Sequence, residues 1–280
     1  MNRNSLTRTK LYASAGILCV ALNGQSFAAS LAPHRAFYVL EEARADKSRD
    51  GISAISGKLA YEVTGSDCEG YAVSYRIGTR FVQGEGETQV SDVQLTSFES
   101  GDGLELDQQQ KQFVNAQLAS ESRLKVKKKT PDAAGEGVFS VPEVKAFTTD
   151  PNVIFPTKFQ QKLLAVAQQG GVRDESLVYE GSDGEKAVRA ISFVGAKKDL
   201  GKLVNEADSV TIASLNKLPY WPMTVSYYTE GAKGDDAPLY QANFNMLENG
   251  VSTDLVLDYG TYALKGRLDK IEMLKADNCK

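Results

Sequence analysis

Short segments in which apolar and polar residues alternate recur along most of this chain, about every ten residues. Residues 55–63 and 71–77 alternate on either side of a Gly65-Ser66-Asp67 turn, a pattern typical of a β-hairpin. A period of two places successive side chains on opposite faces of a strand. Close spacing with glycine, asparagine and aspartate turns favours antiparallel pairing over βαβ units. The pattern therefore predicts an all-β, mainly antiparallel fold with a few helices.

Further strands are expected from the same alternation. They cover residues 89–98, 104–106, 137–141, 176–179, 187–194, 223–228, 238–247, 251–259 and 262–274. A strand series this long has to close, curl or stack to protect its edges. Three helices are expected to interrupt it, over residues 33–44, 156–169 and 200–205. The second is the clearest, because it opens with Pro156, carries an apolar stripe and ends at Gly170-Gly171.

The first 28 residues have the pattern of a secretory signal peptide. Arg3, Arg8 and Lys10 precede an apolar run over residues 11–22, and small residues flank Phe27 before a cleavage site after Ala28. The run is too short for a membrane span, which needs about 20 apolar residues. Cleavage leaves 29 positive and 36 negative side chains, a net charge of −7. We therefore expect an exported chain over residues 29–280 that neither spans a membrane nor binds nucleic acid.

Two cysteines remain after cleavage, Cys68 and Cys279, near the two ends of the mature chain. In an oxidising compartment such a pair most simply forms a disulfide. The bond would close a loop of about 211 residues and, on the chain-entropy model, stabilise the fold by roughly 5 kcal/mol. It also requires the C-terminal tail to return to the early strands, so we expect a single domain.

Catalytic and metal-binding patterns are weak in this sequence. His34 is the only histidine, which excludes multi-histidine metal sites, and we expect it to cap or pack. The glycine-rich stretch 181–186 reads as a turn, since a strand and not a helix follows it. The acidic clusters at 46–50 and 235–236 match no calcium loop. The basic stretch 125–129 reads as a solvated strand face. We expect no catalytic residue, no cofactor and no metal.

The segment Pro219-Tyr220-Trp221-Pro222 holds two amphipathic rings in an extended conformation. Trp221 is expected to plug the core at a sheet edge or to form a wall of an apolar site, and the plug is the favoured interpretation.

Several landmarks in order resemble the EipB (envelope integrity) family of exported proteins. They are residues 31–40, Ile55-Ser56-Gly57 with Glu62, residues 67–71, Phe155-Pro156-Thr157, residues 179–184, Trp221-Pro222, Leu264-Lys265-Gly266 and Cys279. The resemblance implies a periplasmic β-spiral, an open half-barrel of two curved antiparallel sheets around an apolar cavity, similar to the half-barrels of lipoprotein carriers. It also implies one disulfide, Cys68–Cys279, a role in envelope integrity and a tetratricopeptide-repeat partner. It carries over no catalytic residue.

A curved sheet of more than about eight strands encloses more space than its own side chains fill. The helix at 156–169 is the natural plug, through Phe159 and Leu163, and could act as a lid over a ligand. We therefore expect a monomeric, non-catalytic protein that supports the cell envelope through a protein partner. The alternative is a carrier that holds a lipid or a lipoprotein acyl chain.

Overall fold

The computed structural model describes residues 29–45, 51–181, 184–199, 215, 217–233 and 235–276. Within them, fourteen strands form one sheet, and every neighbouring pair is antiparallel. The elements are β1 (His34–Ala45), β2 (Ile52–Ser66), β3 (Gly70–Gln83), a short 3-10 turn η1 (Gly84–Gly86), β4 (Thr88–Glu99), β5 (Glu105–Val114), β6 (Gln117–Lys128), β7 (Gly135–Val141), β8 (Lys145–Thr148), α1 (Pro156–Gln168), β9 (Arg173–Val178), β10 (Val188–Val194), β11 (Tyr220–Thr229), β12 (Tyr240–Leu247), β13 (Ser252–Asp258) and β14 (Tyr262–Met273).

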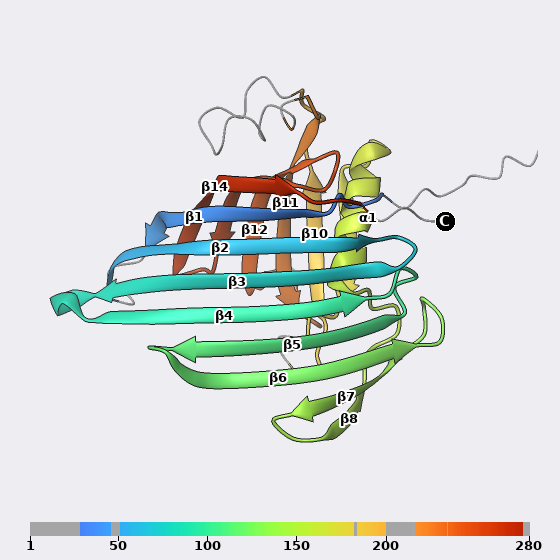
Figure 1. The fold of residues 1–280 in the computed structure, drawn as a ribbon, viewed down its shortest axis with the longest axis horizontal. Coiled ribbons are helices and arrows are strands. Elements are labelled where there is room, and N and C mark those ends of the chain that lie inside the picture. The colour runs from blue at the N-terminus through green and yellow to red at the C-terminus, as the bar shows by residue number, and fades with distance from the viewer. Residues whose placement is uncertain are drawn as a thin grey trace, which may run out of the picture.

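The sheet consists of two arms joined at the two ends of the chain. The first arm runs from β1 outward to β8, the second from β14 outward to β9, and β1 pairs with β14 between them. In Figure 1 the long strands of the first arm lie in front, and β10, β11 and β12 of the second arm lie behind them. The two predicted curved sheets are thus arms of one continuous, open, antiparallel sheet, and the predicted all-β fold class is confirmed.

The prediction of a helix over residues 33–44 is wrong, because this segment forms strand β1. Its even-numbered residues from His34 to Leu40 are buried, and the odd-numbered ones between them are half-buried, which is the period of a strand. β1 pairs with β2 on one side and β14 on the other, so both rows of its backbone groups are satisfied by the sheet. The aromatic and β-branched residues 37–39 also suit a strand better than a helix.

The helix expected over residues 156–169 is confirmed as α1. Pro156 occupies its first turn, and Gly170 beyond its end adopts a positive φ of 77°. The backbone N–H groups of Gly170 and Gly171 donate to the carbonyls of Ala167 and Val166, which ends the helix. The third expected helix, over residues 200–205, lies outside the described residues.

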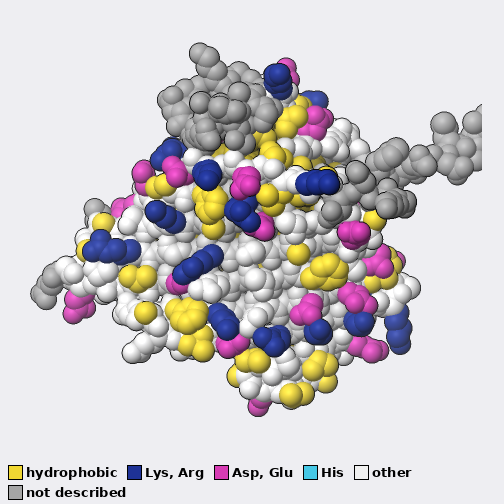
Figure 2. Space-filling view, in the orientation of Figure 1, with side chains coloured by type: hydrophobic (Ala, Val, Ile, Leu, Met, Phe, Trp, Pro, Cys, Tyr) yellow, Lys and Arg dark blue, Asp and Glu magenta, His cyan; other side chains and the backbone are white. Residues whose placement is uncertain are grey.

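Most of the strand predictions are confirmed with shifts at their ends, but β8 was not predicted and β6 was anticipated only through its basic stretch. Within that stretch Lys125, Lys127 and Lys129 are exposed on the outer face, as expected. Lys128 differs, because it points to the opposite face, is 8% exposed and donates to the carbonyls of Val153 and Pro131. Figure 2 shows the outer face of the first arm, where Lys and Arg side chains alternate with acidic ones.

The inner face of the curled sheet buries three apolar clusters. One joins α1 to β10 and β11, one lies under β1, β2, β13 and β14, and one lies between β5, β6, β8 and the segment after β9. In the last cluster Phe147 of β8 contacts Tyr179, with ring centroids 5.7 Å apart. The outermost strands of the two arms are thus linked through side chains, since no β8–β9 ladder forms among the described residues.

Candidate functional site

The three side chains singled out in the sequence, Phe159, Leu163 and Trp221, come together in the apolar cluster around α1. Their exposed fractions are 4%, 1% and 4%. Trp221 lies on β11, two strands inside the edge strand β9, so it fills the core and does not plug a sheet edge. It also lines a pocket of about 260 Å³ beside the C-terminal end of α1. A role of these residues in a ligand cavity or lid stays a prediction.

The N-terminus of α1 is held by a carboxylate from the first arm. Glu99, the last residue of β4, is 2% exposed and accepts hydrogen bonds from the backbone N–H groups of Thr157 (2.7 Å) and Lys158 (3.2 Å). These are N–H groups that a helix cannot satisfy by itself. Burial raises the pKa of Glu99, and the hydrogen bonds from Thr157 and Lys158 oppose that shift.

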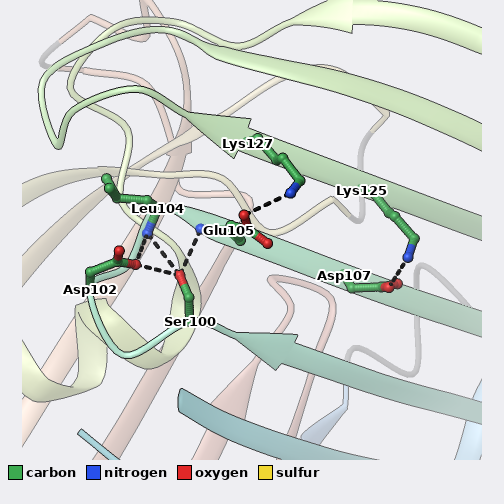
Figure 3. A network of polar contacts seen from close by, with 7 residues as sticks. All are labelled: Ser100, Asp102, Leu104, Glu105, Asp107, Lys125 and Lys127. Atoms are coloured by element: carbon green, nitrogen blue, oxygen red, sulfur yellow. Dashed lines mark hydrogen bonds and ion pairs between the residues drawn. The ribbon is translucent and has the colours of Figure 1, made fainter. Parts of the chain in front are cut away.

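The turn after Glu99 is itself ordered by short polar contacts, shown in Figure 3. Ser100 donates to Asp102, and the backbone N–H groups of Leu104 and Glu105 donate to the Ser100 hydroxyl. Lys158 of α1 reaches over this turn to the carbonyl of Gly101, 2.8 Å away. On the outer face beside the turn, ion pairs join β5 to β6: Glu105 to Lys127 and Asp107 to Lys125.

Further contacts fix α1 to both arms. Gln161 donates to Asp67 in the β2–β3 turn, and the Tyr61 hydroxyl of β2 donates to Gln160. On the other side, Lys162 forms an ion pair of 2.7 Å with Asp174 of β9. With four apolar side chains of the helix buried as well, these contacts favour a fixed plug over a mobile lid.

A cluster of tyrosines that the sequence analysis did not identify lines the inner face, beginning next to Phe159 of α1. We call it the tyrosine cluster; it consists of Tyr75, Tyr227, Tyr240, Tyr259 and Tyr262. Ring centroids of sequence neighbours in this set lie 4.2 Å apart for Tyr227–Tyr240, 6.3 Å for Tyr240–Tyr259 and 5.0 Å for Tyr259–Tyr262. The row continues at one end to Phe159 of α1 and at the other to Phe81 of β3.

Glu180, just after β9, supplies the negative charge of this cluster. Its two carboxylate oxygens accept from the Tyr240 hydroxyl at 2.8 and 3.0 Å, and its backbone carbonyl accepts from the Gln108 side chain at 2.9 Å. Burial, and then the charge of Glu180, raise the pKa values of Tyr227 and Tyr240. Burial raises the pKa of Tyr259 to about 12. These hydroxyls are therefore neutral donors at physiological pH.

Beside Tyr75, the inner face of the first arm changes from apolar to polar between β4 and β5. Tyr75 of β3 lies opposite Leu95 of β4, and Leu95 lies opposite Gln110 of β5. In the adjacent row of the inner face, Val93 lies opposite Gln112. Both glutamines are half-buried, so this part of the inner face offers amide groups beside aromatic rings. Such a surface can contact the apolar part of a ligand with its rings and the polar part with hydroxyls and amides.

The sequence carried a weak signal for this cluster. Tyr227 and Tyr240 stand in adjacent strands, directly opposite each other in the register, and Tyr259 and Tyr262 flank the next turn. The alternation of residues in each strand shows which face of the sheet these tyrosines occupy. It does not show that Glu180, which follows the outer strand β9, contacts Tyr240 of β12.

The remaining candidates have local structural roles. The His34 ring is 3% exposed, its Nδ1 lies 2.8 Å from the carbonyl oxygen of Ala32, and burial lowers its pKa from the ordinary 6.5. Asp236 accepts from the backbone N–H of Lys233 within a turn. In the described part of the chain, no group of three or more His, Cys, Asp and Glu side chains is placed to hold a metal ion. The acidic cluster at 46–50 lies outside the described residues.

Both the sequence and the fold of this chain are similar to those of known proteins. The family model described as EipB-like matches residues 25–275. The chain belongs to the EipB-like family. It is 32% identical over 247 residues to the cell envelope integrity protein EipB of Brucella abortus, a match that covers 88% of this chain and 85% of the relative. A crystal structure of a beta-barrel-like protein of the domain of unknown function DUF1849, from Brucella abortus, matches with a TM-score of 0.78 and 30% identity, over 88% of this chain and 99% of that one.

Family membership confirms the resemblance found in the sequence, and the barrel-like relative agrees with the open, curled sheet seen here. Among the described residues of this EipB-like chain, no helix is long and apolar enough to cross a membrane. Cys68 lies in the β2–β3 turn, whereas Cys279 lies outside the described residues, so the predicted pairing of the two stays a prediction.

Proposed function

We propose that this protein is exported to the periplasm by the signal peptide over residues 1–28 and supports cell-envelope integrity there without catalysing a reaction. The observation that carries the proposal is the 32% identity, over 88% of the chain, to a relative named for cell envelope integrity. The way the interior is used supports it as well. The buried carboxylate Glu99 caps a helix and Glu180 binds a tyrosine hydroxyl, so both serve the fold or a binding surface.

We propose further that the protein acts as a monomer through a periplasmic tetratricopeptide-repeat protein, as the family resemblance implies. The outer strands of the sheet, β8 with four residues and β9 with six, each have one side without a strand partner among the described residues, and backbone groups on that side could serve such a contact. Exposed apolar side chains adjoin both edges, with Val144 81% and Val172 70% exposed.

A deletion strain tests the envelope role. Loss of the gene should sensitise cells to detergent and to cell-wall antibiotics, and the full-length gene should restore resistance. A gene that lacks codons 2–28 serves as the control, because its product should stay in the cytoplasm and fail to complement. Unchanged sensitivity of the deletion strain would refute the envelope role. Sedimentation of the purified protein with and without the tetratricopeptide-repeat protein of the same cell tests both the monomer and the partner.

We propose that Cys68 pairs with Cys279. Support comes from the position of the tail. Val63 of β2 and Met273 of β14 pair with His34 from opposite sides, which places their backbones about 10 Å apart. The tail therefore starts close to the turn that carries Cys68. Intact-mass analysis of alkylated protein should show no reactive thiol without reductant and two with it. Two reactive thiols without reductant would refute the pairing.

A second function, carriage of a lipid or a lipoprotein acyl chain, is favoured by one observation, the tyrosine cluster on the inner face. Tyr259 is 36% exposed, and Gln110 and Gln112 on the inner face of the first arm are half-buried. This combination suits an amphiphile with a polar group better than a bare hydrocarbon chain. Native mass spectrometry of protein purified from the periplasm tests it. A bound lipid that is lost in Tyr240→Ala but kept in Tyr228→Ala would support the carrier, and protein free of ligand would count against it.

A further inference from the structure

The outer face of the sheet carries a recess at the junction of the two arms, where β14, β1, β2 and β3 lie side by side. Its volume is about 470 Å³. The floor is apolar and shallow, and it is formed by Phe37 and Val39 of β1, Ala60 of β2 and Gly78 of β3. Gly78 leaves the recess open, because a Cβ atom at this position would meet no other atom within 4 Å.

Basic side chains surround this floor. Lys58, Arg76 and Lys270 all line the recess. Asp92 neutralises Arg76 through two hydrogen bonds of 2.7 and 2.9 Å, and Asp269, also in the lining, lies 3.8 Å from Arg267. Among the described residues no carboxylate lies within ion-pair distance of Lys58 or Lys270. The recess therefore keeps positive charge on a mature chain whose net charge is −7.

The register of the sheet spaces these charges. Lys270 of β14 lies opposite Phe37 of β1, and Lys58 of β2 lies opposite Val39, two residues farther along β1. Strand spacing and the rise per residue place these two unpaired cations about 12 Å apart, with the side chains of Phe37 and Val39 between them. Side chains at positions i and i+4 of an extended peptide are separated by a similar distance, about 13.6 Å, and position i+2 faces the same way.

We propose that this recess, which we call the basic groove, docks an extended acidic segment of a partner protein, with a large apolar side chain between two carboxylates. The apolar side chain enters the space above Gly78 and Ala60, while the carboxylates meet the basic rim. A membrane surface fits less well, because the overall negative charge of the chain opposes approach to anionic lipid and the apolar floor is recessed. The inference deepens the proposed function, since it gives the partner of that function a docking surface.

Fluorescence anisotropy with three synthetic nonapeptides tests the groove on the full-length exported protein. Their centres read Glu-Ser-Leu-Ser-Glu, Gln-Ser-Leu-Ser-Gln and Glu-Ser-Gly-Ser-Glu. We expect the first to bind at least about tenfold more tightly than the other two. Its binding should weaken as ionic strength rises from about 0.05 M to about 0.5 M.

Two groove variants and two matched controls identify the surface. Lys58→Glu with Lys270→Glu reverses the unpaired charges, and Lys129→Glu with Lys186→Glu makes the same net change elsewhere. Gly78→Ile fills the recess, and Ser74→Ile adds the same bulk on the outer face of the same strand. Each groove variant should lose at least about tenfold in affinity for the Glu-Ser-Leu-Ser-Glu peptide, and each control less than about twofold. Circular dichroism should show all four folded, since Gly78 has room for a side chain.

Equal binding by groove and control variants, or no preference for the first peptide, would overturn the proposal. Phosphatidylglycerol vesicles that bind through the groove when the peptide does not would assign the surface to lipid and overturn it too, as would self-association that only the groove variants abolish. Complementation of the deletion strain separates the two proposals. If the groove variants restore resistance as fully as the wild-type gene does, the groove is refuted and the envelope role stands. If the deletion strain is as resistant as its parent, the envelope role is refuted, while peptide binding to the groove is still tested by anisotropy.

Discussion

The two ends of the interior are built differently, although the same strands run through both. At the end that α1 fills, Val63, Leu163, Leu164 and Met246 are at most 1% exposed, and hydrogen bonds tie the helix to both arms. At the other end Tyr75, Leu95 and Gln110 of the first arm remain half-buried, and Tyr259 is 36% exposed. The difference indicates that the α1 end is a closed core, whereas the other end leaves aromatic and amide side chains accessible.

Truncating one apolar side chain at each end should give the largest contrast. Leu163→Ala at the α1 end should lower the free energy of unfolding by about 3 kcal/mol, and Leu95→Ala at the open end by about 1 kcal/mol, because only the first leaves a closed cavity. Urea unfolding followed by tryptophan fluorescence measures both. Equal losses would show that the two ends are packed alike.

The cap on α1 should come next in size. Glu99→Ala leaves the N–H groups of Thr157 and Lys158 without their acceptor, so it should cost about 2 kcal/mol of unfolding free energy. Glu105→Ala is the control, since its ion pair with Lys127 is exposed and should contribute less than about 0.5 kcal/mol. If the Glu99→Ala variant is as stable as this control, the Glu99 cap does not stabilise the plugged end.

The tyrosine cluster should give a smaller loss. Tyr240→Phe removes the hydroxyl that donates to Glu180, and we expect a cost of about 1 kcal/mol because the cluster is only half-buried. Tyr228→Phe, on the outer face of the adjacent strand, should cost less than about 0.3 kcal/mol. If both variants unfold at the same urea concentration, the hydroxyl contact does not order the open end.

The pH dependence of stability should separate the ends with the smallest effects. His34 belongs to the α1 end, since its ring centroid lies 5.6 Å from that of Tyr61, whose hydroxyl donates to Gln160 of α1. The pKa of His34 is lowered in the folded state, so its contribution is present above pH 6.5 and is lost as the pH falls through the folded pKa. The tyrosine pKa values are raised, so their contribution is present below pH 10 and is lost as the pH rises toward about 12. His34→Gln should reduce only the acid change, to which Glu99 also contributes, and Tyr259→Phe should reduce only the alkaline one. Urea midpoints across pH that show the same slopes in both variants would contradict this assignment.

The sequence predicted the plugged end better than the open end, for local reasons. Pro156, the apolar stripe and the glycines after Gln169 all act within one helix, so they could be read directly from the sequence. β1 was misread because its apolar residues fit either period and only pairing on both flanks decides for the strand. The meeting of Glu180 with Tyr240 could not be predicted, because it depends on how far the second arm curls. The contact between Glu99 and the start of α1 could not be predicted either, because the two are far apart in the sequence and meet only when the first arm folds.

The pairing of β1 with β14 also limits when the sheet can form during synthesis and export. His34 meets Met273 only after almost the whole polypeptide is available, so the central ladder of the sheet is its most non-local contact. A chain that emerges N-terminus first, from a ribosome or a translocation channel, holds an incomplete sheet with β1 open until β14 arrives. Shortening the C-terminus by one strand would therefore split this sheet through its centre and not trim its border.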